Sequence, residues 1–184
     1  MNPFTTARRN PHLMVFRGSM CLLVLLAALA PVESQAAPPA APPAILNGTW
    51  QLDAKRSESL SPILKKLGYG WLARKVMQNL SIKQVISTRA AGVAVRVITR
   101  FTNDTIVMPF DNRWAEGRTL DGGTTKRRSR WLKAKPALLT EDRFPEGLLT
   151  TIRLRVDSST LHEELTFRSP GKAVLSATRV FRRR

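Results

Sequence analysis

Residues 93–101 read Val-Ala-Val-Arg-Val-Ile-Thr-Arg-Phe, and their alternation decides the fold. Valine occupies every second position at the start of this run, and arginine occurs only in the other set of positions. Successive side chains of a β-strand point to opposite faces, so this period of two predicts a strand with one buried and one solvated face. The predicted inward-facing residues are Val93, Val95, Val97, Thr99 and Phe101, and Arg96 and Arg100 are predicted to face water.

The same period of two recurs through the second half of the chain, in short runs separated by turn residues. Such runs favour an antiparallel sheet or barrel. Glu163 and Arg179 fall among the apolar positions and are therefore predicted to point inward, whereas Arg153, Arg155 and His162 fall in outward sets. The further inward-facing sets are Ile106, Met108 and Phe110; Ile152, Leu154 and Val156; Leu161, Glu163, Leu165 and Phe167; and Ala173, Leu175, Ala177, Arg179 and Phe181.

Residues 60–76 depart from this period and show helical spacing instead. Ser61 and Pro62 provide a cap and a first-turn proline, and Gly68 and Gly70 bracket a turn. We therefore expect two short amphipathic helices with a tight connection. Their apolar residues are Leu60, Ile63, Leu64 and Leu67 before the turn, and Trp71, Leu72, Ala73 and Val76 after it.

About nine or ten strands with one helix pair are too many for a flat sheet with one covered face. Closure into a barrel removes the exposed strand edges and creates an interior. The interior of a barrel of this size is either filled by side chains or holds one small ligand. The pattern therefore predicts an all-β barrel with a short helix pair.

The N-terminal 36 residues have the features of an export signal. Arg8, Arg9 and Arg17 precede an apolar run at residues 21–30, and small residues lead to Ala36. This run is about half the length that a helix needs to cross a bilayer. We expect cleavage after Ala36, a proline- and alanine-rich linker at residues 37–45, and one domain at residues 46–184 in the periplasm or outside the cell.

Composition argues against most enzymes. The only cysteine, Cys21, leaves with the signal, and His162 is then the sole histidine. Disulfides and Cys/His zinc sites are thereby excluded from the mature chain. Cys-His catalysis lacks its cysteine, and Ser-His catalysis could use only His162. No paired carboxylates or phosphate loops stand out, so we expect no enzyme, metal or cofactor. Catalysis on such a barrel stays open as a third hypothesis.

Four strings resemble the fatty-acid-binding proteins of the calycin superfamily, in the right order along the chain. Residues 47–52 resemble the opening G-x-W strand of that family, and residues 64–76 are similar to its helix-turn-helix. Residues 99–105 resemble its S-T-F-K-N-T strand, and residues 177–181 resemble its closing T-R-x-Y. The resemblance implies a closed, antiparallel, up-and-down barrel of ten strands with a two-helix lid. It also implies a fatty acid or similar small hydrophobic ligand in the interior.

In that family an arginine and a tyrosine of the last strand, with a second arginine, hold the ligand carboxylate. By resemblance the first arginine is Arg179, and Phe181 stands where the tyrosine would be. The second arginine falls near Leu154, with Arg153 and Arg155 beside it, and a one-residue change of register would point one of these arginines inward. The portal and cavity positions implied are Leu60, Ile63, Leu64, Leu67, Tyr69 and Phe101.

Glu163 leaves the role of Arg179 open. A buried pair of opposite charges is more favourable than either charge alone. If Arg179 pairs with Glu163, or stacks on Trp50, it is structural, and the cavity would suit neutral lipids. If it is free, its permanent charge suits a carboxylate.

The chain is strongly basic, with 30 Lys and Arg against 13 Asp and Glu. This favours a second hypothesis, a filled barrel that binds polyanions or anionic membranes through its surface. We expect a monomer with a small hydrophobic ligand, and nucleic acid is the less favoured partner. The basic residues concerned are Lys126, Arg127, Arg128 and Arg130, and on the helices Lys65, Lys66, Arg74 and Lys75.

Overall fold

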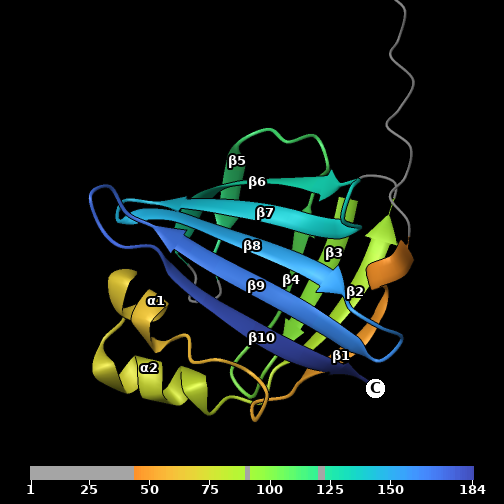
Figure 1. Cartoon of the computed structure of the whole chain (residues 1–184), viewed down its shortest axis with the longest axis horizontal. Coiled ribbons are helices and arrows are strands. Elements are labelled where there is room, and N and C mark those ends of the chain that lie inside the picture. Colours follow the sequence, from red (N-terminus) through yellow and green to blue (C-terminus); the bar gives the residue numbers. More distant parts are fainter. Residues whose placement is uncertain (1–43, 90–91, 120–122) are drawn as a thin grey trace, which may run out of the picture. The chain divides into compact units, whose positions relative to one another are not determined.

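The computed structural model describes residues 44–89, 92–119 and 123–184, which form ten strands, two α-helices and one short 3-10 helix, η1 (Figure 1). The predicted signal at residues 1–36 and nearly all of the predicted linker lie outside these residues. In chain order the elements are η1 (Ala44–Leu46), β1 (Gly48–Leu52), α1 (Ser61–Lys66), α2 (Trp71–Gln78), β2 (Lys83–Arg89), β3 (Gly92–Ile98), β4 (Asn103–Met108), β5 (Ala115–Arg118), β6 (Thr124–Leu132), β7 (Ala137–Phe144), β8 (Gly147–Arg155), β9 (Thr160–Arg168) and β10 (Leu175–Arg183).

The strands form one antiparallel sheet in the order β4-β3-β2-β1-β10-β9-β8-β7-β6-β5. Within these described residues, strands that are consecutive in the chain pair with each other, except β4 and β5, and β1 pairs with β10. The predicted up-and-down barrel of ten strands with a helix pair is therefore confirmed. Its closure is incomplete, because β4 and β5 do not pair in the described chain. The residue that follows β4, Pro109, accepts a hydrogen bond of 2.7 Å through its carbonyl from the Ser129 hydroxyl of β6, and this contact links the two sides of the open seam.

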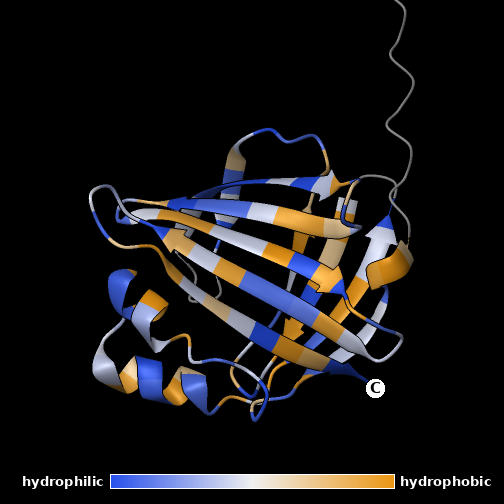
Figure 2. Ribbon diagram, viewed as in Figure 1, coloured by the Kyte–Doolittle hydropathy of each residue, from blue (hydrophilic) through white to orange (hydrophobic). Residues whose placement is uncertain are grey.

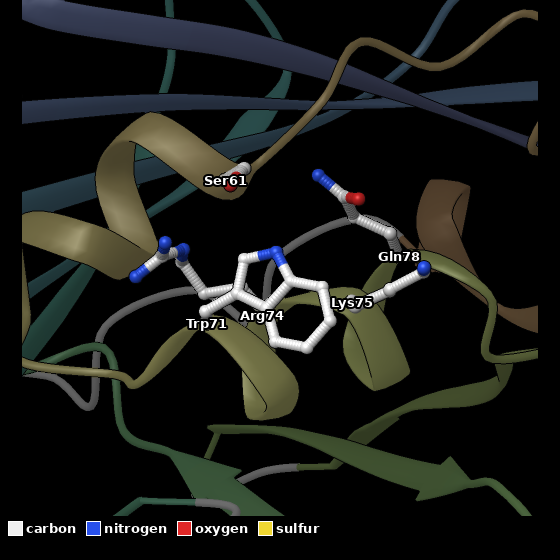
Figure 3. Close-up of a pocket in the computed structure, with 5 residues that line it drawn as sticks. All are labelled: Ser61, Trp71, Arg74, Lys75 and Gln78. Carbon is white, nitrogen blue, oxygen red and sulfur yellow. The ribbon is translucent and has the colours of Figure 1, made fainter.

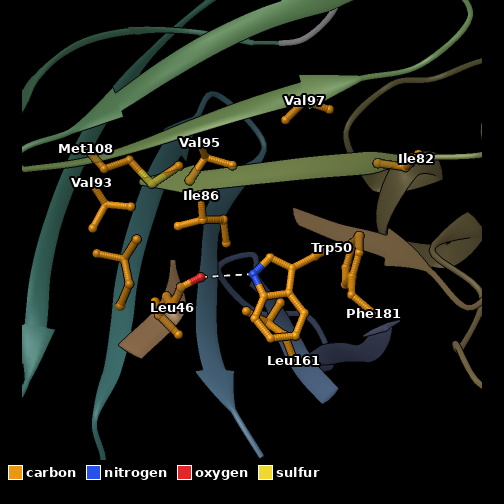
Figure 4. Close-up of a cluster of buried hydrophobic side chains, with 11 residues drawn as sticks. Leu46, Trp50, Ile82, Ile86, Val93, Val95, Val97, Met108, Leu161 and Phe181 are labelled. Carbon is orange, nitrogen blue, oxygen red and sulfur yellow. Dashed lines mark hydrogen bonds between the residues drawn. The ribbon is translucent and has the colours of Figure 1, made fainter. Parts of the chain in front are cut away.

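The end of the barrel away from the helices is filled by an apolar cluster around Trp50 (Figure 4). The Trp50 indole N–H donates to the Leu46 carbonyl at 2.9 Å, so its polar atom is satisfied inside the core. Leu46 belongs to η1, which begins within the predicted linker at Ala44. The fully buried members of this cluster are Leu46, Trp50, Val93, Val95, Leu138, Leu161 and Phe181.

Helix α1 packs at the opposite end of the barrel. Its Ile63 is buried against Phe167 of β9 and Ala177 of β10. Gly68, with φ +86°, lies in the turn after α1, in a conformation that favours glycine. Helix α2 buries none of its residues completely. In the part of the chain that the structure describes, neither helix is long and apolar enough to cross a bilayer.

Hydrophobic and hydrophilic residues alternate along the strands (Figure 2), and most predicted faces are confirmed. Val93, Val95 and Val97 are buried, as are Leu161 and Glu163. Strand β3, however, ends at Ile98, so Thr99 lies beyond it. The prediction that Phe101 points inward is wrong, because this residue is 67% exposed in the turn before β4.

The predicted face of β8 is also wrong. Arg153 lies opposite Glu163 in the register of β8 and β9, and the two side chains form an ion pair of 2.6 Å inside the barrel. Ile152 and Leu154 therefore face outward, and Val156 lies exposed past the end of the strand. Shifting a strand by one residue exchanges its two faces. The apolar residues Ile152 and Leu154 made their own face of β8 look like the buried one. The pattern within β8 cannot show that Arg153 has a buried partner, because that partner, Glu163, lies on β9.

We predict that Glu163→Gln lowers the free energy of unfolding by about 3–5 kcal/mol, because it leaves Arg153 buried without a counter-ion. Glu164→Gln is the matched control. Its carboxylate is on the outer face, 3.3 Å from Lys135, and exposed. That change should cost less than about 1 kcal/mol. Urea unfolding of both variants gives the comparison, and equal effects would contradict the assigned register.

Candidate ligand-binding site

A layer of polar side chains crosses the barrel interior between the Trp50 cluster and α1. The Arg153–Glu163 ion pair lies in this layer, with side chains 11% and 6% exposed. Gln84 of β2 is also buried and donates its amide N–H to the same Glu163 oxygen at 3.5 Å. Thr140 of β7 donates its hydroxyl to the sulfur of Met108 at 3.3 Å. Residues from separate strands thus form one buried polar network.

Arg179 lies beside Glu163 in the register of β10 and β9. It makes no hydrogen bond or ion pair with the described residues, since the Glu163 carboxylate pairs with Arg153. Its guanidinium carbon lies 5.6 Å from the centre of the Phe181 ring. Burial lowers the pKa of Arg179, an effect that Glu163 opposes and Arg153 reinforces. Arginine nevertheless stays charged in proteins.

A second ion pair joins β6 to β7 on the inner face. Arg127 Nε lies 2.7 Å from Asp142 Oδ1, and both side chains are largely buried. Burial raises the pKa of Asp142, and Arg127 opposes this shift. Each buried carboxylate therefore already has an arginine partner. Arg179 is the cation of this layer whose charge stays unpaired in the described chain.

The other predicted lipid-binding residues do not lie together: they occur on the outer face of the sheet, at the Trp50 end and near α1. Leu154 faces outward, and Arg155 donates to the carbonyls of Asp157 and Ile45 near the Trp50 end. Leu64 and Leu67 are half-buried on and just after α1. Leu67 and Tyr69 also line a cavity of about 320 Å³, together with Thr119, Gly123, Thr124, Phe144, Pro145 and Glu146.

Sequence reasoning missed Gln84, Asp142 and the inward direction of Arg127. Arg127 belongs to a basic run whose composition predicts a surface feature. The period of two in this run, which places Lys126 and Arg128 on the other face, could have revealed it. Gln84 carries no signal of its own, because a single glutamine in a strand is usually exposed.

The predicted basic surface divides in two. On β6, Arg128 pairs with Glu141 and lies over the Trp114 ring, which leaves Lys126 and Arg130 exposed. On the helices, Lys65, Lys66 and Lys75 are exposed. Arg74 donates to the Tyr69 carbonyl at 2.6 Å and lines a cavity of about 260 Å³ with Ser61, Trp71, Lys75 and Gln78 (Figure 3).

Comparison with known proteins gives similarity in structure alone. No protein family model and no curated protein sequence matches the chain. Among solved structures, a Schistosoma mansoni fatty acid binding protein in complex with arachidonic acid aligns with a TM-score of 0.66 and 19% identity, over 77% of this chain and 99% of that one.

Two further solved structures align with this chain to a similar extent. The REP1-NXSQ fatty acid transporter aligns with a TM-score of 0.64 and 20% identity, over 76% of this chain and 96% of that one. Human cRBP IV aligns with a TM-score of 0.59 and 19% identity, over 77% of this chain and 100% of that one. At such identities the likeness concerns the fold. The chain therefore has the same barrel fold as these fatty-acid-binding and retinol-binding structures.

Proposed function

We propose that this protein binds a fatty acid inside its barrel and sequesters or carries it. The observation behind the proposal is the unpaired charge of Arg179 in a layer where Glu163 and Asp142 are both paired with other arginines. An interior cation without a counter-ion is unfavourable. A ligand carboxylate would supply the missing charge through charge-assisted hydrogen bonds. The structural neighbours that bind fatty acids support this proposal.

The apolar side chains near α1 suit the hydrocarbon tail of such a ligand. Partly buried leucines surround Ile63 and Phe167 between the helix and the polar layer. A carboxylate at Arg179 would direct its tail among them, toward the cavity at Leu67 and Tyr69. The leucines concerned are Leu60, Leu67, Leu149, Leu165 and Leu175.

We predict that Arg179→Met weakens binding of hexadecanoic acid by about 10- to 100-fold, because charge-assisted hydrogen bonds contribute about 1.5–3 kcal/mol. The same change should leave the stability of the empty barrel unchanged or higher, since it removes an unpaired interior charge. Isothermal titration calorimetry and urea unfolding measure the two effects.

Arg182→Met is the matched control on the same strand. Arg182 is half exposed and lies 3.7 Å from Asp53, so its removal should not alter hexadecanoic acid binding. Hexadecanol serves as a neutral probe. Equal binding of acid and alcohol, or unchanged binding of the acid by Arg179→Met, would contradict a carboxylate site.

We also propose that the protein acts after export, because residues 1–36 have the pattern of a signal peptide. Expression of the whole chain in bacteria should yield a periplasmic protein that begins at Ala37, as measured by intact mass. A protein that retains residues 1–36 or stays in the cytoplasm would count against export.

As a second function we propose that the helix end docks on anionic membranes. Trp71 and Leu72 of α2 are 66% and 67% exposed, beside the exposed Lys75, whose ammonium lies 5.2 Å from the Trp71 ring centre. Apolar side chains next to lysines suit insertion at a lipid headgroup boundary. On β6, by contrast, two of the four predicted basic residues are already paired with carboxylates.

The test of docking is flotation with vesicles of anionic lipid. We predict that the double variant Trp71→Ser, Leu72→Ser loses most of its vesicle binding, because it removes the apolar contacts. Val156→Ser, which changes a 51% exposed valine in the turn between β8 and β9, should bind as the wild type does. Equal loss in both variants, or no loss in either, would contradict docking through α2.

A further inference from the structure

Two atoms of the buried polar layer have no hydrogen-bond partner in the described chain. They are Oε1 of Gln84 and Nε of Arg153. Gln84 is only 4% exposed. Its amide nitrogen and the Arg153 Nη2 atom contact the same oxygen of Glu163, at 3.5 and 2.6 Å. The two unpaired atoms therefore belong to one small region of the interior.

The chemistry of these atoms is complementary. The Gln84 nitrogen faces the Glu163 carboxylate, and reversing the amide would place two acceptors against each other. The unpaired Gln84 atom is therefore an acceptor, which needs a donor. The Arg153 Nε–H is a donor, which needs an acceptor. Leaving either unpaired inside a protein is unfavourable.

A simple carboxylate cannot satisfy this set. It offers acceptors to Arg179 and to Arg153, but it has no proton to donate to Gln84. A hydroxyl group donates and accepts, so it can serve Gln84 and Arg153 together. Arg179 and Arg153 lie on the two strands that flank Glu163, each about 5 Å from its strand. The guanidinium groups at the ends of these long side chains lie close enough for the charge of Arg153 to lower the pKa of Arg179. A hydroxyl a few bonds from a carboxylate can therefore reach Arg153 while the carboxylate lies at Arg179.

We infer that the barrel prefers fatty acids with a hydroxyl group on the second or third carbon. This inference rests on the proposed binding of a carboxylate at Arg179. The carboxylate lies at Arg179, and the hydroxyl donates to Gln84 Oε1 and accepts from Arg153 Nε. The competing explanation is a buried water molecule that satisfies the same two atoms in the empty protein.

The test compares hexadecanoic acid with its 2-hydroxy and 3-hydroxy derivatives by calorimetry. In the wild-type protein at least one hydroxy acid should bind about tenfold more tightly than hexadecanoic acid, because its hydroxyl exchanges hydrogen bonds to water for two in the interior, and the net gain is small. In Gln84→Met this preference should disappear, because the acceptor of the hydroxyl proton is removed. Gln51→Met, a change on β1 whose amide donates to Ser81, should keep the preference.

The outcomes separate the two proposals. If the wild-type protein binds all three acids equally, a water satisfies the two atoms and the inference is overturned, but the fatty acid site stands. A preference that persists in Gln84→Met also overturns it. If none of the acids binds, the proposed function fails and the inference fails with it. The wild-type comparison alone decides the matter if Gln84→Met does not fold.

Discussion

The Arg153–Glu163 ion pair is the interaction on which the interior depends. Two charges removed from water must pair, and this pair of 2.6 Å lies between neighbouring strands. It fixes which face of β8 points inward. It also occupies the carboxylate nearest to Arg179, so that Arg179 is left with an unpaired charge. The same ion pair thus stabilises the register and leaves Arg179 available for the ligand carboxylate that we propose.

Charge interactions in this polar layer are strengthened by the apolar side chains that pack on both sides of it. The Trp50 cluster closes one end, and α1 packs Ile63 against Phe167 and Ala177 at the other. Charges between such ends interact in a medium of lower dielectric constant than water. A ligand carboxylate would therefore interact more strongly with Arg179 than with the exposed cations of the surface. The cavity that Leu67 and Tyr69 line is the place where we propose that a lipid enters.

Much of this fold could be predicted from alternation alone. The valines of β3 and the mixed set of β9, Glu163 included, fall on the predicted face because each strand separates its buried and solvated residues. The helix pair follows from the spacing of its leucines and the glycines between its halves. The predicted inward direction of Phe101 was wrong because the strand ends at Ile98. Strand ends are set by hydrogen bonds in the turns, which the alternation of apolar and polar residues does not encode.

Less of the candidate site than of the fold could be predicted from the sequence. Arg179 and Glu163 could be placed inside, since each interrupts an apolar set. Arg153 and Arg127 could not, because their partners are on other strands and only the register brings them together. Gln84 is a single polar residue whose meaning comes from Glu163, 79 positions away. Pairings between strands determine the chemistry of the interior, and a single sequence does not specify them.

We propose above all that a lipid carboxylate pairs with Arg179 inside the barrel. The most direct measurement is carbon-13 NMR of hexadecanoic acid, labelled at its carboxyl carbon and bound to the protein, from about pH 8 to about pH 4. We expect a resonance that stays at the ionised position, because the guanidinium keeps the pKa of the ligand carboxyl below its ordinary value. A resonance that titrates like a carboxyl in water, or that is protonated throughout, would contradict it.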